Sequence, residues 1–193
     1  MSPSAQTKIT GGEWRGRQVS TPRDLLLRPT RAVVREALFN ILGDAVLDAA
    51  VVDLFAGAGT VGFEALSRGA ARVTFVDREE RALGHIRATA ERLGCAERCR
   101  IIRADAPGWV RSRPAELADA AIVFADAPYR DDSILSVLAA LGDAPPPLVV
   151  CEHHRARLLP DRIGGLVTVR RARYGITDVS IMRPADMEVG SGD

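Results

Sequence analysis

The 193-residue sequence predicts an α/β protein: a mostly parallel, doubly wound sheet with a C-terminal antiparallel hairpin and a small N-terminal β-hairpin extension. Two observations predict the sheet. Short apolar runs alternate with amphipathic stretches through the middle of the chain, which is typical of parallel strands joined by helices. A glycine-rich turn follows the first of these runs, at residues 57–62. With 47% hydrophobic residues, the chain can also bury the core that such a fold requires.

The N-terminal part of the chain predicts a hairpin followed by a helix. Residues 8–22 contain two short candidate strands around glycines, which indicate a β-hairpin. Apolar side chains recur at helical spacing in residues 31–42, and Thr30 is available as the N-cap of that helix. We therefore expect an extension over residues 1–22.

The strands and helices of the main domain, residues 23–184, follow in alternation. The expected strands of the parallel sheet are 50–55, 72–77, 100–104, 121–125 and 148–151. The expected helices are one that ends at Leu66, one over 79–93 and one over 133–141. Residues 166–173 and 178–182 flank the turn 174–177, which indicates an antiparallel hairpin. The polar tail, 185–193, is expected to be frayed.

Charge is unevenly distributed along the chain although the totals nearly cancel. The 26 basic and 25 acidic residues give a net charge of +1, which by itself argues against a nucleic-acid-binding protein. Residues 8–35 and residues 155–183 each carry +5, however, and residues 36–153 carry −6. Both flanks are therefore candidate contacts for phosphate groups.

Cysteine usage and hydropathy narrow the class of protein further. The chain has three cysteines, Cys95, Cys99 and Cys151, with no secretory signal before them, which predicts a reduced, cytoplasmic protein. Cys95 and Cys99 lack a second ligand pair, so we expect no metal site. No apolar run reaches the length of a membrane span, and we expect no membrane contact.

The first candidate site is the segment from Asp53 to Gly62, after the first predicted strand. Ligands of doubly wound sheets bind at the carboxyl ends of the strands, where glycines let the backbone approach closely. Gly57, Gly59 and Gly62 match the dinucleotide pattern G-x-G-x-x-G, but Asp53 would repel a pyrophosphate and attract an ammonium group. S-adenosylmethionine carries such an amine and no phosphate. The segment favours that cofactor. A nicotinamide-dependent reductase and a tight strand-to-helix turn that binds no ligand remain the alternatives.

Two further carboxylates follow the next predicted strands. Asp77 suits ribose hydroxyls, because a carboxylate accepts two hydrogen bonds from a diol. Asp105 would accept from the adenine amino group. Either residue alone is more typical of a helix cap, and only their shared position after successive strands favours a role in binding.

The second candidate site is Asp126-Ala127-Pro128-Tyr129, after the strand at 121–125. The Asp126 carboxylate and the Ala127 carbonyl can both accept from an exocyclic amino group, so that its lone pair faces an electrophile. The Tyr129 ring can stack on a flipped-out base. The alternative is an Asp-x-Pro turn with a surface tyrosine.

These two motifs resemble those of class I S-adenosylmethionine-dependent amino-methyltransferases, whose fourth motif is usually D/N-P-P-Y/F. Longer segments resemble the RsmD family of 16S rRNA guanine-N2 methyltransferases: ITGGEWRGRQV, LRPTRAVVREALFNIL, DLFAGAGTVGFEALSRGA and YGITDVSIM. The resemblance covers nearly the whole chain except its two tails. Ala127 replaces the first proline of the fourth motif, which keeps the accepting carbonyl and makes the loop less rigid.

The resemblance implies a Rossmann-like class I methyltransferase sheet and methylation of N2 of guanine 966, in the 30S subunit or an assembly intermediate, by a monomer. The implied catalytic residues are Asp126, Ala127, Pro128 and Tyr129. The implied cofactor contacts are Asp53, Phe55, Gly57, Gly59, Asp77, Arg78, Asp105 and Ala106. The implied RNA contacts are Lys8, Trp14, Arg15, Arg17, Arg28, Arg31 and Arg35. A catalytically silent RNA-binding or assembly protein of the same fold remains an alternative.

Overall fold

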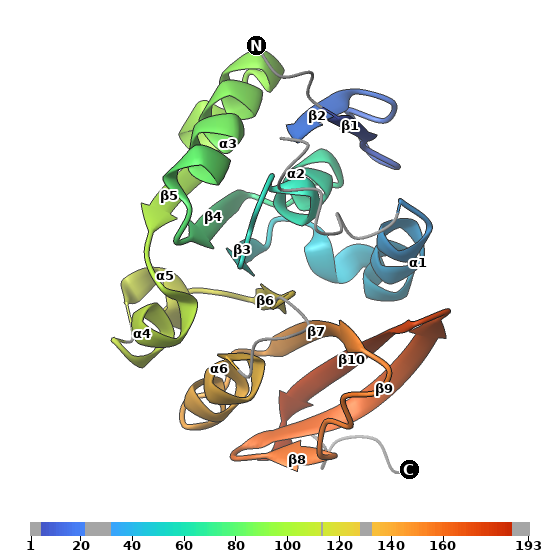
Figure 1. The fold of residues 1–193 in the computed structure, drawn as a ribbon, viewed down its shortest axis with the longest axis vertical. Helices are drawn as coiled ribbons and strands as arrows, with labels where there is room; N and C mark the ends of the chain where they lie inside the picture. Colours follow the sequence, from blue (N-terminus) through green and yellow to red (C-terminus); the bar gives the residue numbers. More distant parts are fainter. Residues whose placement is uncertain (1–4, 22–31, 113, 128–132, 187–193) are drawn as a thin grey trace.

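The computed structural model describes residues 5–21, 32–112, 114–127 and 133–186. Its centre is an eight-stranded sheet with the strand order β5-β4-β3-β6-β7-β10-β9-β8 (Figure 1). The parallel strands are β3 (Ala50–Leu54), β4 (Arg72–Asp77), β5 (Cys99–Arg103), β6 (Ile122–Ala125) and β7 (Leu148–His154). The antiparallel strands are β8 (Arg162–Ile163), β9 (Leu166–Tyr174) and β10 (Thr177–Pro184). The predicted fold class is confirmed.

Helices cover both faces of this sheet and bury two hydrophobic cores. One face carries α1 (Ala32–Leu42), α2 (Thr60–Ser67) and α3 (Glu80–Leu93), whose apolar side chains pack in the first core. The other face carries α4 (Ala106–Arg111) and α6 (Ser133–Gly142) in the second core. Shorter elements connect them: the 3-10 turns η2 (Gly43–Val46) and η3 (Ala96–Arg98) and the helix α5 (Ala115–Ala118).

The sequence did not predict α4, α5 or β8. In α4, Pro107 and Gly108 occur within six residues, and both are typical of loops. The structure explains the helix because Pro107 lies in its first turn, where a missing N–H costs nothing, and Asp105 caps that turn. The two-residue β8 is too short to give a pattern.

The N-terminal extension is a hairpin of β1 (Ala5–Lys8) and β2 (Gln18–Thr21), paired antiparallel and separate from the main sheet. Its tip packs on the last turn of α2. The Trp14 N–H donates to Ser67 Oγ over 2.9 Å, and the Glu13 N–H donates to the Ser67 carbonyl over 2.8 Å. Because residues 68–71 lead from α2 to the first residue of β4, the tip lies at the amino edge of the sheet.

A buried carboxylate attaches this hairpin to the main domain. Glu64 of α2 has no exposed side-chain surface. Its oxygens accept from Thr10 N (2.9 Å), Thr10 Oγ1 (2.7 Å), Gly11 N (2.8 Å) and Arg68 Nε (2.9 Å). Burial opposes ionisation of Glu64, but hydrogen bonds from Thr10 and Arg68 and the charge of Arg35 outweigh it, so that its pKa is lowered. The extension is therefore an integrated part of the domain.

Candidate functional site

The candidate site lies at the carboxyl edge of the sheet, where the order of the strands reverses. The chain passes from β3 to β4 and β5 on one side, and β6 and β7 lie on the other side of β3. Open α/β sheets bind ligands in the crevice outside such a switch point. The two sequence motifs follow β3 and β6, the two strands that meet there.

Strand register brings three of the predicted site residues to the same level. Leu54 pairs with Val76 on one side and with Ala125 on the other. The next residues along these three neighbouring strands are Phe55, Asp77 and Asp126. An aromatic ring and two carboxylates therefore occupy adjacent positions at the carboxyl edge.

The glycine-rich turn after β3 is held by carboxylates of two strands. The Gly57 N–H donates to Asp77 Oδ2 over 2.7 Å, and the Gly62 N–H donates to Asp53 Oδ2 over 3.0 Å. Phe55 is a non-glycine residue in the left-handed region, with φ 60°. Such backbone strain persists only where the surrounding structure imposes it, and it is frequent at binding sites.

Two glycines of the turn are required by close packing and one leaves open space. A Cβ added at Gly62 would collide with the Phe75 ring, and one at Gly59 would lie 3.0 Å from that ring. At Gly57, by contrast, the nearest atom to an added Cβ would be the Phe55 carbonyl oxygen at 3.9 Å. The backbone at Gly57 thus forms an open cradle that a ligand can approach closely.

Asp53 is the most perturbed carboxyl group of the site. It is 3% exposed and lies in register with Phe75 and Phe124, both members of the first core. Burial raises its pKa to about 8, against the opposing effect of the hydrogen bond from Gly62. Without a compensating cation, this carboxyl group is therefore mostly protonated at neutral pH.

The remaining predicted cofactor residues lie along the same edge. Asp77 is half-buried; besides Gly57, it accepts from the Glu79 N–H through Oδ1 over 2.9 Å, and each oxygen keeps a second lone pair. Asp105 is exposed and caps α4 by accepting from Gly108 N over 3.1 Å, which is the cap role that the sequence left open. Arg78 is exposed beside Glu79, and Ala106 is buried at the start of α4.

The predicted catalytic residues are described in part. Asp126 is half-buried directly after β6, and Ala127 is 4% exposed in the second core; Pro128 and Tyr129 lie outside the described residues. Burial, with a further contribution from the charge of Asp126, raises the pKa of the Cys151 thiol. This thiol therefore stays protonated, which counts against a thiolate nucleophile at this site.

The predicted RNA contacts that the structure describes differ in their exposure to solvent. Lys8, Arg15 and Arg17 are exposed, and Arg28 and Arg31 lie outside the described residues. Two expectations are corrected. Trp14 is 5% exposed, with the Arg98 guanidinium 5.5 Å from its ring centre. Arg35 is 1% exposed, beside Glu64 and donating to the Lys8 carbonyl over 2.7 Å. Both side chains are part of the interior. The sequence pattern did not distinguish these two buried residues from exposed residues that could contact RNA.

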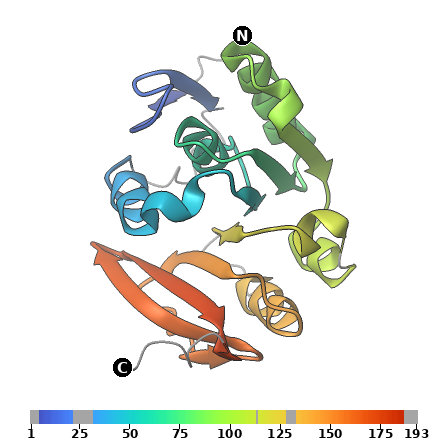
Figure 2. The ribbon, with the colours of Figure 1, turned by 180° about the vertical axis from the view of Figure 1, so that it is seen from behind.

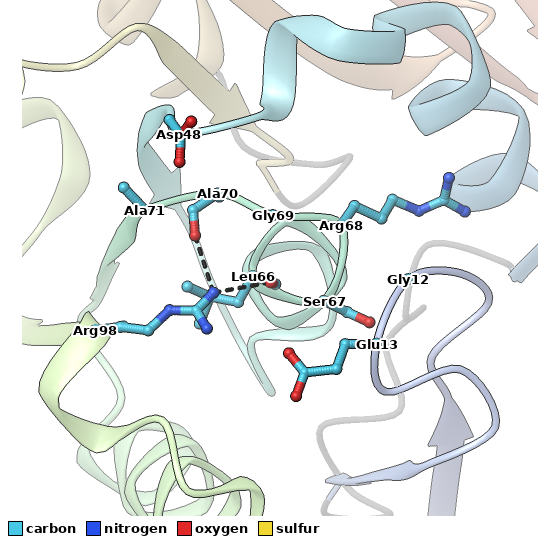
Figure 3. Close-up of a pocket in the computed structure, with 10 residues that line it drawn as sticks. All are labelled: Gly12, Glu13, Asp48, Leu66, Ser67, Arg68, Gly69, Ala70, Ala71 and Arg98. Carbon is cyan, nitrogen blue, oxygen red and sulfur yellow. Dashed lines mark hydrogen bonds between the residues drawn. The ribbon is translucent and has the colours of Figure 1, made fainter.

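An open depression of about 480 Å³ lies at the opposite, amino edge of the sheet (Figure 3). Gly12, Ser67 and Arg98 are among the residues that line it. Arg98 donates through Nη2 to the carbonyls of Leu66 and Ala70, at 2.9 Å each, and so satisfies the end of α2. Arg98 therefore has a structural role, and the depression lies at the edge of the sheet opposite to the two sequence motifs.

Within the described ranges, no group of three or more His, Cys, Asp or Glu side chains is arranged to hold a metal ion. No helix in this part of the chain is long and apolar enough to cross a membrane.

The chain is similar to known proteins in sequence and in overall fold. Residues 7–183 match the model of the family described as Conserved hypothetical protein 95. Ribosomal RNA small subunit methyltransferase D of Escherichia coli is 35% identical over 142 residues, which are 74% of this chain and 70% of the relative. The solved structure of yhhF from E. coli is 28% identical, with a TM-score of 0.80 over 93% of this chain and 98% of that one.

A more distant structure shows the fold alone. The RNA methyltransferase from Salinibacter ruber, solved in complex with S-adenosyl-L-homocysteine, is 17% identical. Its TM-score is 0.62 over 86% of this chain and all of that chain. The two chains therefore share their overall fold at very low sequence identity.

Proposed function

The chain belongs to the Conserved hypothetical protein 95 family, that of the RsmD-type class I methyltransferases, and on this premise we propose that it methylates ribosomal RNA. The proposed target is the exocyclic N2 of a guanine in 16S rRNA, and the proposed methyl donor is S-adenosylmethionine. The observation that carries the proposal is the placement of Phe55, Asp77 and Asp126 at one level of the carboxyl edge. Methyl transfer to an amino group needs a cofactor pocket and a hydrogen-bond acceptor side by side.

The residues present fit this cofactor. The Gly57 cradle leaves room for close approach, Asp77 has free lone pairs for a ribose diol, and Asp53 gains its charge when an ammonium group compensates it. When bound, S-adenosylmethionine supplies an electrophilic methyl group on a sulfonium. We expect Asp105 and Ala106, at the start of α4, to contact the adenine.

The chemistry left to the protein is orientation and charge stabilisation. The Asp126 carboxylate and the Ala127 carbonyl accept hydrogen bonds from the guanine amino group, which fixes its lone pair in line with the methyl group. As the nitrogen becomes cationic, Asp126 stabilises the developing charge. The proton leaves the nitrogen after transfer, so no strong base is needed beforehand.

The proposed substrate is the 30S subunit or an assembly intermediate, and the proposed working form is a cytoplasmic monomer. The described residues form one sheet with its helices and a hairpin that is docked on it, so the particle itself supplies much of the shape that is recognised. In this proposal, the basic residues of the domain itself bind the folded RNA.

The test is methyl transfer from labelled S-adenosylmethionine to 30S subunits from a strain that lacks the modification. We expect incorporation into one guanine, located by primer extension and identified as N2-methylguanosine by mass spectrometry. Asp126→Asn should lower the rate at least about 100-fold. The matched control is Asp119→Asn, an exposed carboxylate just before β6 at the amino edge, which should have no effect. No incorporation with the wild-type protein would refute the enzymatic function, and methyl groups on another atom would refute the N2 assignment.

A further inference from the structure

The outer part of the sheet projects beyond the candidate site. Ala125, the last residue of β6, pairs with Cys151 of β7, which pairs with Ser180 of β10. β7 continues for three more residues, all paired with β10, to His154 opposite Thr177. Three residues correspond to about 10 Å of strand. A wall made of β7, β10 and β9 therefore rises beside Asp126, on the side of the carboxyl edge.

The β9–β10 turn forms the top of this wall. β10 runs antiparallel to β7, so the turn between Tyr174 and Thr177 lies at the carboxyl edge. The Arg155 N–H donates to the Ile176 carbonyl over 2.9 Å and ties the segment after β7 to the turn. Both views of the molecule place this hairpin and the β1–β2 hairpin at opposite ends (Figures 1 and 2).

Exposed arginines lie on the outer strand of this wall, β9, and at its top. β8 pairs only with Leu166 and Val167, so from Thr168 to Tyr174 the described residues provide no strand on the outer side of β9. Arg170, Arg171 and Arg173 are all exposed along this open stretch, and Arg155 is exposed at its top.

Arginines outnumber acidic residues in the segment from Arg155 to Arg183. Asp178 accepts from Arg173 through both oxygens, at 2.8 and 3.0 Å, and Asp161 lies 2.9 Å from Arg171. No further acid occurs between residues 155 and 183, which carry a net charge of +5. The ion pair also orients Arg173: it uses Nε and Nη2 and leaves the other N–H donors of an exposed guanidinium for a ligand.

Two basic residues of the N-terminal hairpin, Arg15 and Arg17, lie too far from the candidate site to hold RNA beside it. Arg15 and Arg17 lie in the hairpin tip at the amino edge, about a strand length from the carboxyl edge. We propose that Arg155, Arg170 and Arg173, which lie at the top and on the two faces of the open β9 edge, hold backbone phosphates of the rRNA flanking the target guanine. This inference rests on the proposed function. Charge complementarity selects RNA as the partner, since phosphates match a segment in which seven arginines face only two acidic residues.

The first test compares two variants with equal loss of charge. Arg155→Gln/Arg170→Gln/Arg173→Gln should bind 30S subunits at least about tenfold more weakly at moderate salt, and the slope of log K against log salt should fall by about one per arginine. The matched control is Arg15→Gln/Arg17→Gln/Arg72→Gln, three exposed arginines at the amino edge, which should bind nearly as the wild type. An equal loss in both variants, or no loss in the first, would overturn the proposal.

A second pair of variants separates RNA binding from protection of an open strand edge. Charges of either sign prevent edge-to-edge pairing. Arg155→Glu/Arg170→Glu keeps the edge charged and the Arg173–Asp178 pair intact, so it should remain monodisperse in light scattering and yet bind RNA more weakly than Arg155→Gln/Arg170→Gln. Wild-type affinity of the Glu variant would assign the arginines to edge protection and overturn the proposal.

The readouts also keep this inference apart from the proposed function. Binding of S-adenosylhomocysteine should be unchanged in all of these variants, which shows that the domain is folded. If the wild type binds 30S subunits without methylating them, the proposed function fails and the inference about RNA binding stands. If affinity falls for the 30S subunit but not for a naked 16S rRNA fragment, the arginines contact a ribosomal protein and the proposal is wrong.

Discussion

Replacing Glu64 with glutamine should release the N-terminal hairpin from the domain. In the wild type, Oε1 accepts from Thr10 Oγ1, Gly11 N and Arg68 Nε, and Oε2 accepts from Thr10 N with Arg35 Nε at 3.5 Å. A glutamine amide has one oxygen and one NH2 group. In either orientation it sets a donor against N–H donors of the hairpin, and it removes the largest favourable charge beside the buried Arg35.

The cost follows from the burial of Arg35, which is 1% exposed. Removing one partner of a buried ion pair destabilises a protein by about 3–5 kcal/mol, because the other charge stays buried and uncompensated. Total stabilities of single domains are about 5–15 kcal/mol, so Glu64→Gln should lower the denaturant midpoint strongly without abolishing folding. Adding Arg35→Met should restore part of the loss, since the buried charge is then removed as well.

Urea denaturation followed by circular dichroism measures this loss, and trypsin cleavage after Lys8, Arg15 and Arg17 reports release of the hairpin. The matched control is Glu80→Gln, which breaks an exposed pair with Arg87 and should cost less than about 1 kcal/mol. A loss for Glu64→Gln as small as that of the control, with trypsin resistance unchanged, would refute the idea that the buried carboxylate holds the hairpin.

Three further predictions concern the turn, the hairpin and the cofactor. Because the folded-state pKa of Asp53 is about 8, above its ordinary 3.8, the charged form of Asp53 is disfavoured in the folded protein; the stability gained by Asp53→Asn over the wild type should therefore grow between about pH 4 and pH 8 and reach up to about 4 kcal/mol at pH 7, measured by urea denaturation of both proteins across this range. Gly12→Ala should cost about 2–4 kcal/mol in the same assay, since its φ is +75° and a Cβ would collide with the Ser67 carbonyl; Gly16→Ala, with φ +84° and open space, should cost about 1 kcal/mol. Asp77→Asn should weaken binding of S-adenosylhomocysteine at least about tenfold in calorimetry, because it disturbs both the Gly57 loop and the ribose contact.

The sequence was sufficient for the sheet because buried parallel strands leave a direct record in it. Apolar runs such as 72–77 and 121–125 have no competing interpretation next to helices of clear amphipathic spacing, and the structure places strands there within one residue. The positions of Asp77 and Asp126 after their strands follow from the same record. Their side-by-side placement depends on strand order, which no local pattern contains.

Burial of charged residues was not predictable in the same way. Arg35 lies on α1, whose apolar spacing predicts which side faces the core. An arginine on this helix is expected to be exposed unless a buried acidic partner is known. The partner, Glu64, is 29 residues away and is itself buried in α2. The burial of Trp14 was unpredictable for the same reason. A tryptophan close to basic residues is typical of a side chain that stacks on bases, but the Trp14 backbone is hydrogen-bonded to Ser67, 53 residues further along the chain.

The directions of α2 and β10 determine which basic segment lies at the edge of the sheet that carries the candidate site. α2 begins at the carboxyl edge and ends at the amino edge, so a hairpin tip anchored to Ser67 and Arg68 is carried away from the site. β10 begins at the carboxyl edge because it is antiparallel to β7, so the turn before it is carried toward the site. The two segments have the same net charge of +5 in the sequence. Among the described residues, however, Arg15 and Arg17 lie at the amino edge, whereas the arginines of β9 and Arg155 lie on the strands that rise beside the candidate site, so a near-neutral total charge conceals basic groups at both edges of the sheet and only those of the C-terminal segment are close to Asp126.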